Sequence, residues 1–220
     1  MADRVLKVTN PIMKGSDVKA CQTLLLAHGI YDLEADAKFG KITAAKVKLF
    51  QGLRGLPVTG KVDAKTWSAL RASPVTGSAH FKASEFRCRC GKCRGFMEGV
   101  PSGVRLETLV LLELIRDTVN KKYGNGKEYP LYVHSGYRCP AHNKAAGGAA
   151  KSQHMYARAV DISSPICTPY QLGLICDALD PRGGVGLGGL NIVHADTRPG
   201  KSRWWYTYKS WAAWKKRFNR

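Results

Sequence analysis

Residues 135–162 read SGYRCPAHNKAAGGAAKSQHMYARAVDI, and residues 191–196 read NIVHAD. In the first stretch the small residues 147–150 indicate a turn, and residues 157–162 then have the composition of a short strand. The second stretch is also strand-like, and alternation along it places His194 and Asp196 on one face. Two short apolar strands that carry polar side chains predict a small sheet with a site on it.

Three side chains of these stretches, His154, Asp161 and His194, are candidate metal ligands. Asp161 lies between Val160 and Ile162, and a buried carboxylate is costly unless it is paired or bound to a metal. Zinc binds imidazole nitrogen and carboxylate oxygen, and a catalytic zinc keeps three protein ligands and one open position. The set therefore predicts one Zn2+ that activates a water molecule.

The order S-G-Y-R, then S-x-H-x6-D, then a distal His resembles the zinc D-Ala-D-Ala metallopeptidases, which also include L-Ala-D-Glu endopeptidases of phage endolysins. The resemblance covers about residues 80–206. It implies that His154, Asp161 and His194 bind zinc. It also implies that Arg138 holds the substrate and stabilises the oxyanion of the tetrahedral intermediate. A structural arginine at a strand end is the alternative for Arg138.

The chain departs from this family pattern at two positions. Ala157 stands where the family usually carries Gly, between two of the ligands. Asn191 stands three positions before the distal His, where several relatives have an acidic residue, and an amide cannot accept the proton of the zinc-bound water. We therefore assign the catalytic base to Asp196, which shares the face of His194. The alternative is that Asp196 orients His194 through its second ring nitrogen.

Residues 15–70 predict a compact module of three helices. Val18, Cys21, Leu24 and Leu25 have helical apolar spacing. A half-repeat follows, since D-x-x-F-G-x-x-T at residues 36–43 is echoed by T-G-x-V-x-x-x-T-W at residues 59–67. The threonines of this half-repeat suggest N-caps for the second and third helices.

This module is similar to the peptidoglycan-binding domain found beside many wall hydrolases. The shared motifs are G-x-x-V-x-x-x-Q from Gly15, F-G-x-x-T from Phe39 and F-Q-x-x-x-G-L from Phe50, and the match spans residues 8–71. The usual Asp-Gly of the domain is Asp36-Ala37 here, which predicts an altered loop. The resemblance implies that peptidoglycan is the binding partner of this part of the chain.

The expected fold class is α+β with two domains. A peptidoglycan-binding helical domain takes residues 1–73, and a zinc metallopeptidase domain takes residues 79–220. The boundary is placed in residues 71–78, which are rich in small and turn-forming residues. In the second domain we expect helices at residues 106–119 and 170–179, a strand at residues 131–134 that delivers Arg138, and a small antiparallel sheet.

The formal net charge of +19 favours an anionic partner, such as nucleic acid, an anionic membrane or an acidic wall polymer. Residues 201–220 interleave aromatic and basic side chains. We expect Trp204 and Trp205 to pack against the catalytic core, and residues 215–220 to contact the anionic envelope or disturb the membrane. No nucleic acid partner is expected, and the chain is expected to be a monomer.

Seven cysteines leave at least one without an intramolecular disulfide partner. Cys88, Cys90 and Cys93 are close in sequence, and Cys139 next to Arg138 could approach them in space. Free or partly paired thiols are the favoured interpretation, ahead of a structural zinc bound by four thiolates; two disulfides are also possible.

Both parts of the chain point to the same polymer. The function we expect is an endolysin-like peptidoglycan hydrolase that cleaves stem-peptide bonds, more as an endopeptidase than as a carboxypeptidase. Residues 1–7 lack the apolar core of a signal peptide, which predicts synthesis in the host cytoplasm and action on the wall after release. The alternatives are a bacterial D-Ala-D-Ala carboxypeptidase and, from another class, a non-catalytic wall-binding or nucleic-acid-binding protein.

Overall fold

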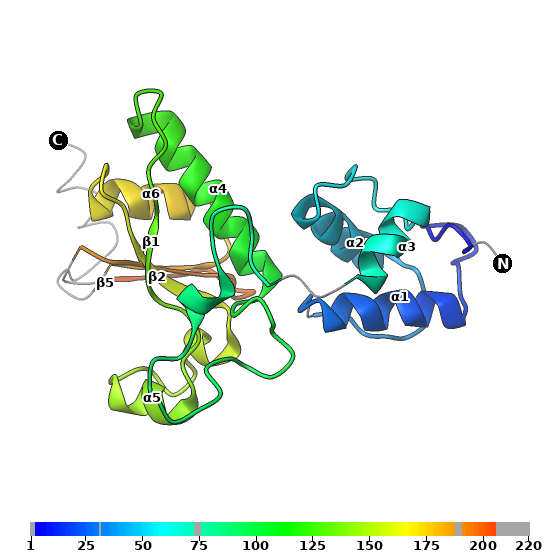
Figure 1. The fold of residues 1–220 in the computed structure, drawn as a ribbon, viewed down its shortest axis with the longest axis horizontal. Coiled ribbons are helices and arrows are strands. Elements are labelled where there is room, and N and C mark those ends of the chain that lie inside the picture. The colour runs from blue at the N-terminus through cyan, green and yellow to red at the C-terminus, as the bar shows by residue number, and fades with distance from the viewer. Residues whose placement is uncertain (1–2, 31, 73–75, 188–190, 206–220) are drawn as a thin grey trace.

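A computed structural model describes residues 3–30, 32–72, 76–187 and 191–205 (Figure 1). The amino-terminal part contains α1 (Ser16–Ala27), α2 (Lys41–Leu53) and α3 (Ala64–Arg71). Their apolar faces meet in one buried core, which includes Val18, Leu25, Val47, Phe50 and Trp67. The three expected helices are therefore present.

Two buried glutamines make the half-repeat of this part visible in three dimensions. Gln22 accepts a hydrogen bond from the Ala37 amide at 2.9 Å, and Gln51 accepts one from the Gly60 amide at 2.8 Å. Gln22 donates to Thr43 Oγ1 at 3.2 Å, and Gln51 donates to Thr66 Oγ1 at 3.1 Å. Each glutamine thus holds the loop before the next helix in place through hydrogen bonds to its backbone and to the following threonine.

The prediction that these threonines act as N-caps is wrong. Thr43 lies inside α2 and Thr66 lies inside α3, whereas the N-cap residues are Gly40 and Asp63. Asp63 accepts a hydrogen bond from the Thr66 amide at 2.8 Å, as a capping carboxylate does. The two threonines are buried, and hydrogen bonds from the glutamines satisfy their hydroxyl groups.

The carboxy-terminal part is built on a five-stranded sheet with the order β1-β2-β4-β3-β5. Its elements, in chain order, are η1 (Ala83–Phe86), α4 (Leu106–Tyr123), β1 (Tyr132–Ser135), α5 (Pro140–Ala145), η2 (Gln153–Tyr156), β2 (Ala159–Ser163), α6 (Pro169–Leu179), β3 (Gly184–Leu187), β4 (Val193–Asp196) and β5 (Ser202–Trp205). The α+β class is confirmed. The expected first strand and both expected helices are present, and α4 runs four residues further than predicted.

The sheet is mixed rather than antiparallel as predicted. β1, β2, β4 and β3 pair antiparallel, but β5 pairs parallel with β3. The chain reverses after β4 and then passes beyond β3 to the edge of the sheet, so β5 runs in the direction of β3. This long-range pairing has no local signal in the sequence.

The two faces of the sheet have different roles. Val160 and Ile162 of β2, with Val193 and Ala195 of β4, are buried in a core shared with α4 and α6. Alternation then places Asp161 and His194 on the opposite face. Figure 1 shows α6 on one side of the strands and the loops around α5 on the other. The sheet thus separates its core from its polar face.

The two parts of the chain touch through α2 and α4. Lys46 Nζ lies 2.7 Å from Glu107 Oε1, and Arg158 Nη2 lies 2.6 Å from Asp32 Oδ1. These ion pairs link the helical part to α4 and to the turn before β2. Within the part of the chain that is described, no helix has both the length and the apolar character needed to cross a bilayer.

Candidate metal centre

His154, Asp161 and His194, hereafter the metal triad, converge on the polar face of the sheet. Asp161 and His194 are directly paired across β2 and β4. His194 Nδ1 lies 3.0 Å from Asp161 Oδ1, and His154 Nε2 lies 3.3 Å from the same oxygen. The two ring nitrogens are 3.2 Å apart. One ligand atom from each of the three residues can therefore face a single ion.

The outer nitrogen of each imidazole has a hydrogen-bond acceptor, which leaves the inner nitrogen for a metal. His154 Nδ1 lies 2.6 Å from the Gly136 carbonyl oxygen, and His194 Nε2 lies 2.9 Å from Asp196 Oδ2. An acceptor at one ring nitrogen fixes the proton there and directs the lone pair of the other nitrogen inward. The residues present fit zinc, since the donor set is two imidazoles and one carboxylate.

The electrostatics of the metal triad suit a cation. Burial alone would raise the pKa of Asp161, but hydrogen bonds with His154 and His194 hold it well below its ordinary value. Burial lowers the pKa of His154. The pKa of His194 is raised despite burial, because carboxylates of Asp161 and Asp196 face its two nitrogens. Two of the three ligands are thus held in the protonation state that binds a metal.

Asp196 lies behind His194 and not beside the inner nitrogens. Its Oδ2 contacts His194 Nε2, and its Oδ1 accepts from Arg198 Nε at 2.8 Å and from the Arg198 amide at 3.0 Å. The side chain is fully buried, and hydrogen bonds from His194 and Arg198 outweigh the effect of burial and hold its pKa well below the ordinary value. This placement differs from that expected of a base. It matches the orienting alternative.

Arg138 lies next to the metal triad in the loop after β1. Its Nε donates to Ser135 Oγ at 2.8 Å, and its Nη2 pairs with Asp161 Oδ2. The backbone amide of Arg138 donates to the His154 carbonyl oxygen at 3.2 Å. Asp161 therefore presents one oxygen to the histidines and the other to Arg138, which places the guanidinium beside anything bound at the triad.

Two glycines of β3, which the sequence reasoning missed, make room for this arrangement. A Cβ at Gly184 would lie 2.2 Å from an Asp196 carboxylate oxygen, and a Cβ at Gly186 would lie 2.3 Å from the Trp204 ring. The Trp204 ring centroid is 4.8 Å from that of His194, so the predicted packing of Trp204 on the catalytic core is confirmed. A Gly-x-Gly strand was the available signal, because glycine inside a strand often marks close approach.

Ala157 occupies the turn that separates His154 from β2. Its φ is 52°, in the left-handed region that glycine adopts most readily. It is fully buried, and its carbonyl oxygen accepts from the Arg105 amide at 2.7 Å. The family preference for Gly at this position thus has a conformational cause, and alanine accommodates the same turn.

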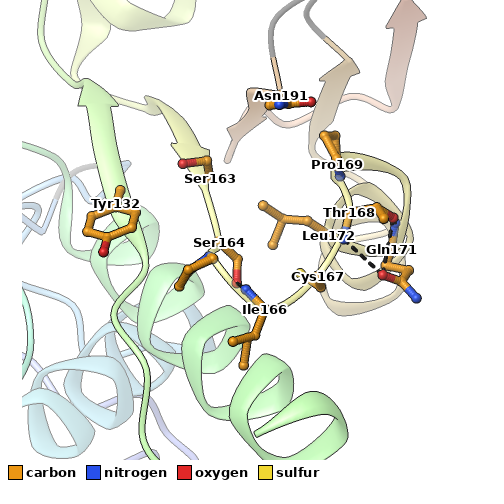
Figure 2. Close-up of a pocket in the computed structure, with 11 residues that line it drawn as sticks. Tyr132, Ser163, Ser164, Ile166, Cys167, Thr168, Pro169, Gln171, Leu172 and Asn191 are labelled. Carbon is orange, nitrogen blue, oxygen red and sulfur yellow. Dashed lines mark hydrogen bonds between the residues drawn. The ribbon is translucent and has the colours of Figure 1, made fainter.

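A pocket of about 620 Å3 opens beside β2, β1 and the start of α6 (Figure 2). Ser163, two residues after Asp161 on the same strand face, lines it together with Tyr132, Asn191 and residues 164–169, 171 and 172. None of the described residues that line this pocket carries a positive charge. No residue of the metal triad lines this pocket. The predicted basic tail at residues 215–220 lies outside the described residues.

Family models match both parts of the chain. The model of the Peptidase M15 family matches residues 79–196, and that of a peptidoglycan binding domain matches residues 14–70. A zinc D-Ala-D-Ala carboxypeptidase from Streptomyces albus G is 28% identical over 136 residues, which cover 60% of this chain and 51% of that protein. The chain thus spans about half the length of this curated relative.

A similar solved structure is that of a fused Zn-dependent amidase, peptidase and peptidoglycan-binding domain-containing protein from Clostridium acetobutylicum. It is 20% identical, with 59% of this chain and 49% of that chain covered, and its TM-score of 0.31 is too low to bear on the fold. The family match covers more than half of the chain and includes every residue of the metal triad. The chain therefore belongs to the Peptidase M15 family and joins to that domain a peptidoglycan-binding domain.

Proposed function

We propose that this protein is a zinc-dependent peptidoglycan hydrolase that cleaves peptide bonds of the wall stem peptides. The observation that carries the proposal is the convergence of the metal triad in a chain that also has a peptidoglycan-binding domain. A binding domain raises the local concentration of a polymer around the site to which it is tethered. The relative named as a zinc D-Ala-D-Ala carboxypeptidase supports the same substrate class.

The residues of the chain divide the chemistry between them. When bound, zinc supplies a Lewis acid and lowers the pKa of water to about 7. Arg138 is placed to donate to the carbonyl oxygen of the scissile bond, because it already lies against Asp161. Asp196 orients His194, and Gly136 orients His154 through its carbonyl oxygen. We assign Asp196 to orientation rather than to proton transfer.

We propose an endopeptidase as the first candidate. A carboxypeptidase must hold the terminal carboxylate of its substrate, for which a nearby cation is the strongest partner. Arg138 is a cation beside the metal triad, and it can hold either a terminal carboxylate or the carbonyl oxygen of an internal bond. The geometry therefore fits both candidates, and the products decide between them. A D-Ala-D-Ala carboxypeptidase is the second candidate, favoured by the named relative.

Digestion of purified sacculi tests both candidates. We expect release of stem-peptide fragments that EDTA abolishes and added zinc restores. Mass spectrometry of the fragments identifies the bond: cleavage at an internal stem bond supports the endopeptidase, and free D-Ala alone supports the carboxypeptidase. Binding to sacculi without any EDTA-sensitive product would overturn the hydrolase in favour of a wall-binding protein.

The proposal extends to an endolysin-type role, in which the enzyme reaches the wall from the cytoplasm after the membrane is opened. The net charge of +19 suits an enzyme that meets an anionic envelope. Production in bacteria with and without a co-expressed membrane-permeabilising protein tests this role. Rapid lysis is expected only with both proteins, and lysis by the enzyme alone would contradict the requirement for a partner.

A further inference from the structure

Four sulfur atoms that do not belong to the metal triad gather at one point. Cys88, Cys90 and Cys93 lie in the loop after η1, and Cys139 is the N-cap of α5; these four residues are the cysteine cluster. Their sulfurs all lie within 4.8 Å of one another, and Cys139 Sγ is 3.8 Å from Cys90 Sγ. A tetrahedron with zinc–sulfur bonds of about 2.3 Å has edges of about 3.8 Å. A disulfide would bring two sulfurs to about 2.05 Å.

Each sulfur of the cluster accepts a hydrogen bond from a backbone amide. The donors are Cys139 N to Cys88, Lys92 N to Cys90, Gly95 N to Cys93 and His142 N to Cys139, at 3.3–3.4 Å. Hydrogen bonds from amides stabilise negative charge on an acceptor, and partners of this kind hold metal ligands in position. Gly91, with φ 68°, provides the tight turn that lets Cys90 and Cys93 face the same point.

The charges around the cluster match four thiolates. Arg87, Arg89, Lys92 and Arg94 lie in or beside the loop, and residues 86–97 contain no acidic residue. Four thiolates around one Zn2+ carry a net charge of about −2, which nearby cations stabilise. A basic loop without carboxylates also excludes cations that require oxygen ligands.

We propose that Cys88, Cys90, Cys93 and Cys139 bind a second, structural zinc ion. The geometry reverses the preference drawn from the sequence for free or partly paired thiols. Four protein ligands leave no open position, so this zinc has no part in hydrolysis. Three of its ligands precede α4 and the fourth follows β1. The zinc would therefore hold together two segments that are distant in sequence.

The same zinc would hold the loop that carries Arg138. Tyr137 N donates to the Phe86 carbonyl oxygen at 2.8 Å, and a Cβ at Gly136 would lie 2.6 Å from Phe86 Cα. The Gly136 carbonyl oxygen in turn accepts from His154 Nδ1. Because Cys139 follows Arg138 directly, a metal that fixes Cys139 to residues 88–93 fixes the approach of Arg138 and the orientation of His154.

Metal counting and cobalt spectroscopy test the proposal without relying on activity. Protein purified under reducing conditions is expected to hold two zinc ions per chain. The His154→Ala variant is expected to hold one, and after exchange to cobalt it should keep the near-ultraviolet sulfur-to-cobalt charge-transfer band. The Cys90→Ser variant is expected to bind cobalt more weakly at this site and to show a smaller band, because one of the four sulfur–cobalt bonds is missing. Cys167→Ser, which changes a half-buried cysteine outside the cluster, is the matched control and should keep the full band.

Two results would overturn the proposal of a structural zinc. One zinc per chain in the unaltered protein, with no charge-transfer band in cobalt-loaded His154→Ala, would overturn the proposal. So would two disulfides within the cluster, located by peptide mass spectrometry in protein whose free thiols were alkylated at lysis, because disulfides would then occupy the four sulfurs. Failure of the hydrolase assay leaves these readouts unchanged, so the two proposals are tested separately.

Discussion

The glutamines of the helical part and the metal triad of the sheet are both buried polar groups, yet they differ in how their donors and acceptors are used. Gln51 donates to and accepts from the loop before α3, so its amide is satisfied by the protein itself. His154 and His194 each satisfy one nitrogen and direct the other toward Asp161. A buried polar group therefore indicates a structural role where the protein itself satisfies all its hydrogen bonds. It indicates a binding site where unused lone pairs of several groups face one point.

Removal of a triad ligand gives the largest expected effect. His154→Ala should reduce hydrolysis of sacculi to background and lower the zinc content by one ion per chain, because two ligands do not retain a catalytic zinc. Zinc analysis and product release measure the two effects. His80→Ala is the matched control, since His80 pairs with Glu113 at the surface and should leave both unchanged. Activity retained in His154→Ala would remove the metal triad from the mechanism.

Arg138→Ala separates substrate stabilisation from metal binding. Loss of one oxyanion donor lowers kcat by about 10²–10³-fold, and zinc content should stay unchanged. Steady-state hydrolysis of a stem-peptide substrate and metal analysis on the same sample measure both. Arg138→Lys should recover part of kcat if charge near the carbonyl matters. Loss of zinc in Arg138→Ala would instead assign the arginine a structural role through its contact with Asp161.

Asp196→Asn distinguishes orientation from proton transfer. An amide still contacts His194 Nε2 but no longer fixes its proton as a carboxylate does, so zinc affinity should fall by about 10–100-fold. At saturating zinc, kcat should return to near the unaltered value. Titration with a zinc indicator measures the zinc affinity, and assays at high zinc measure kcat. A low kcat with zinc fully bound would restore Asp196 as the catalytic base.

The glutamine networks should respond to mutation in stability and not in chemistry. Gln51→Leu leaves the buried Gly60 amide without its acceptor, which should cost about 1–3 kcal/mol of unfolding free energy. Gln22→Leu is the matched variant in the other half of the repeat. Hydrogen exchange in α2 and α3 reports the change, and zinc content should not move. A loss of zinc would mean that the two parts are coupled more tightly than their surface ion pairs indicate.

The helices and the metal ligands could be predicted from the sequence, because both depend on the spacing of residues within short segments. The ligands His154, Asp161 and His194 and the helices followed from periodicity and motif order. The N-cap prediction failed at Thr43 and Thr66 because a tertiary partner, the buried glutamine, uses each hydroxyl. The contact between Asp196 and His194 Nε2 could not be predicted. Alternation places both side chains on one face of the strand, but it does not show which ring nitrogen lies next to the carboxylate. The parallel pairing of β5 is also set by distant contacts alone.

The smallest expected effect concerns His28, a buried histidine of the helical part whose lone pairs do not converge with others. Its Nε2 lies 2.8 Å from the Leu70 carbonyl oxygen, and its Nδ1 is buried without a partner among the described residues. Burial lowers the pKa of His28 below its ordinary value of 6.5. Its contribution to stability is therefore complete above pH 6.5 and is lost as the pH falls through the folded-state pKa.

Once the pH is below 6.5, stability should fall by at most about 1.4 kcal/mol per pH unit for this one proton. Hydrogen exchange of α1 and α3 between pH 8 and pH 5, corrected for intrinsic rates, measures the loss in the helical part alone. His28→Gln can still donate to Leu70 but does not titrate, so its profile should be flatter. An equal slope in both proteins would show that His28 is not the titrating group, and that its unpartnered nitrogen is tolerated in either protonation state.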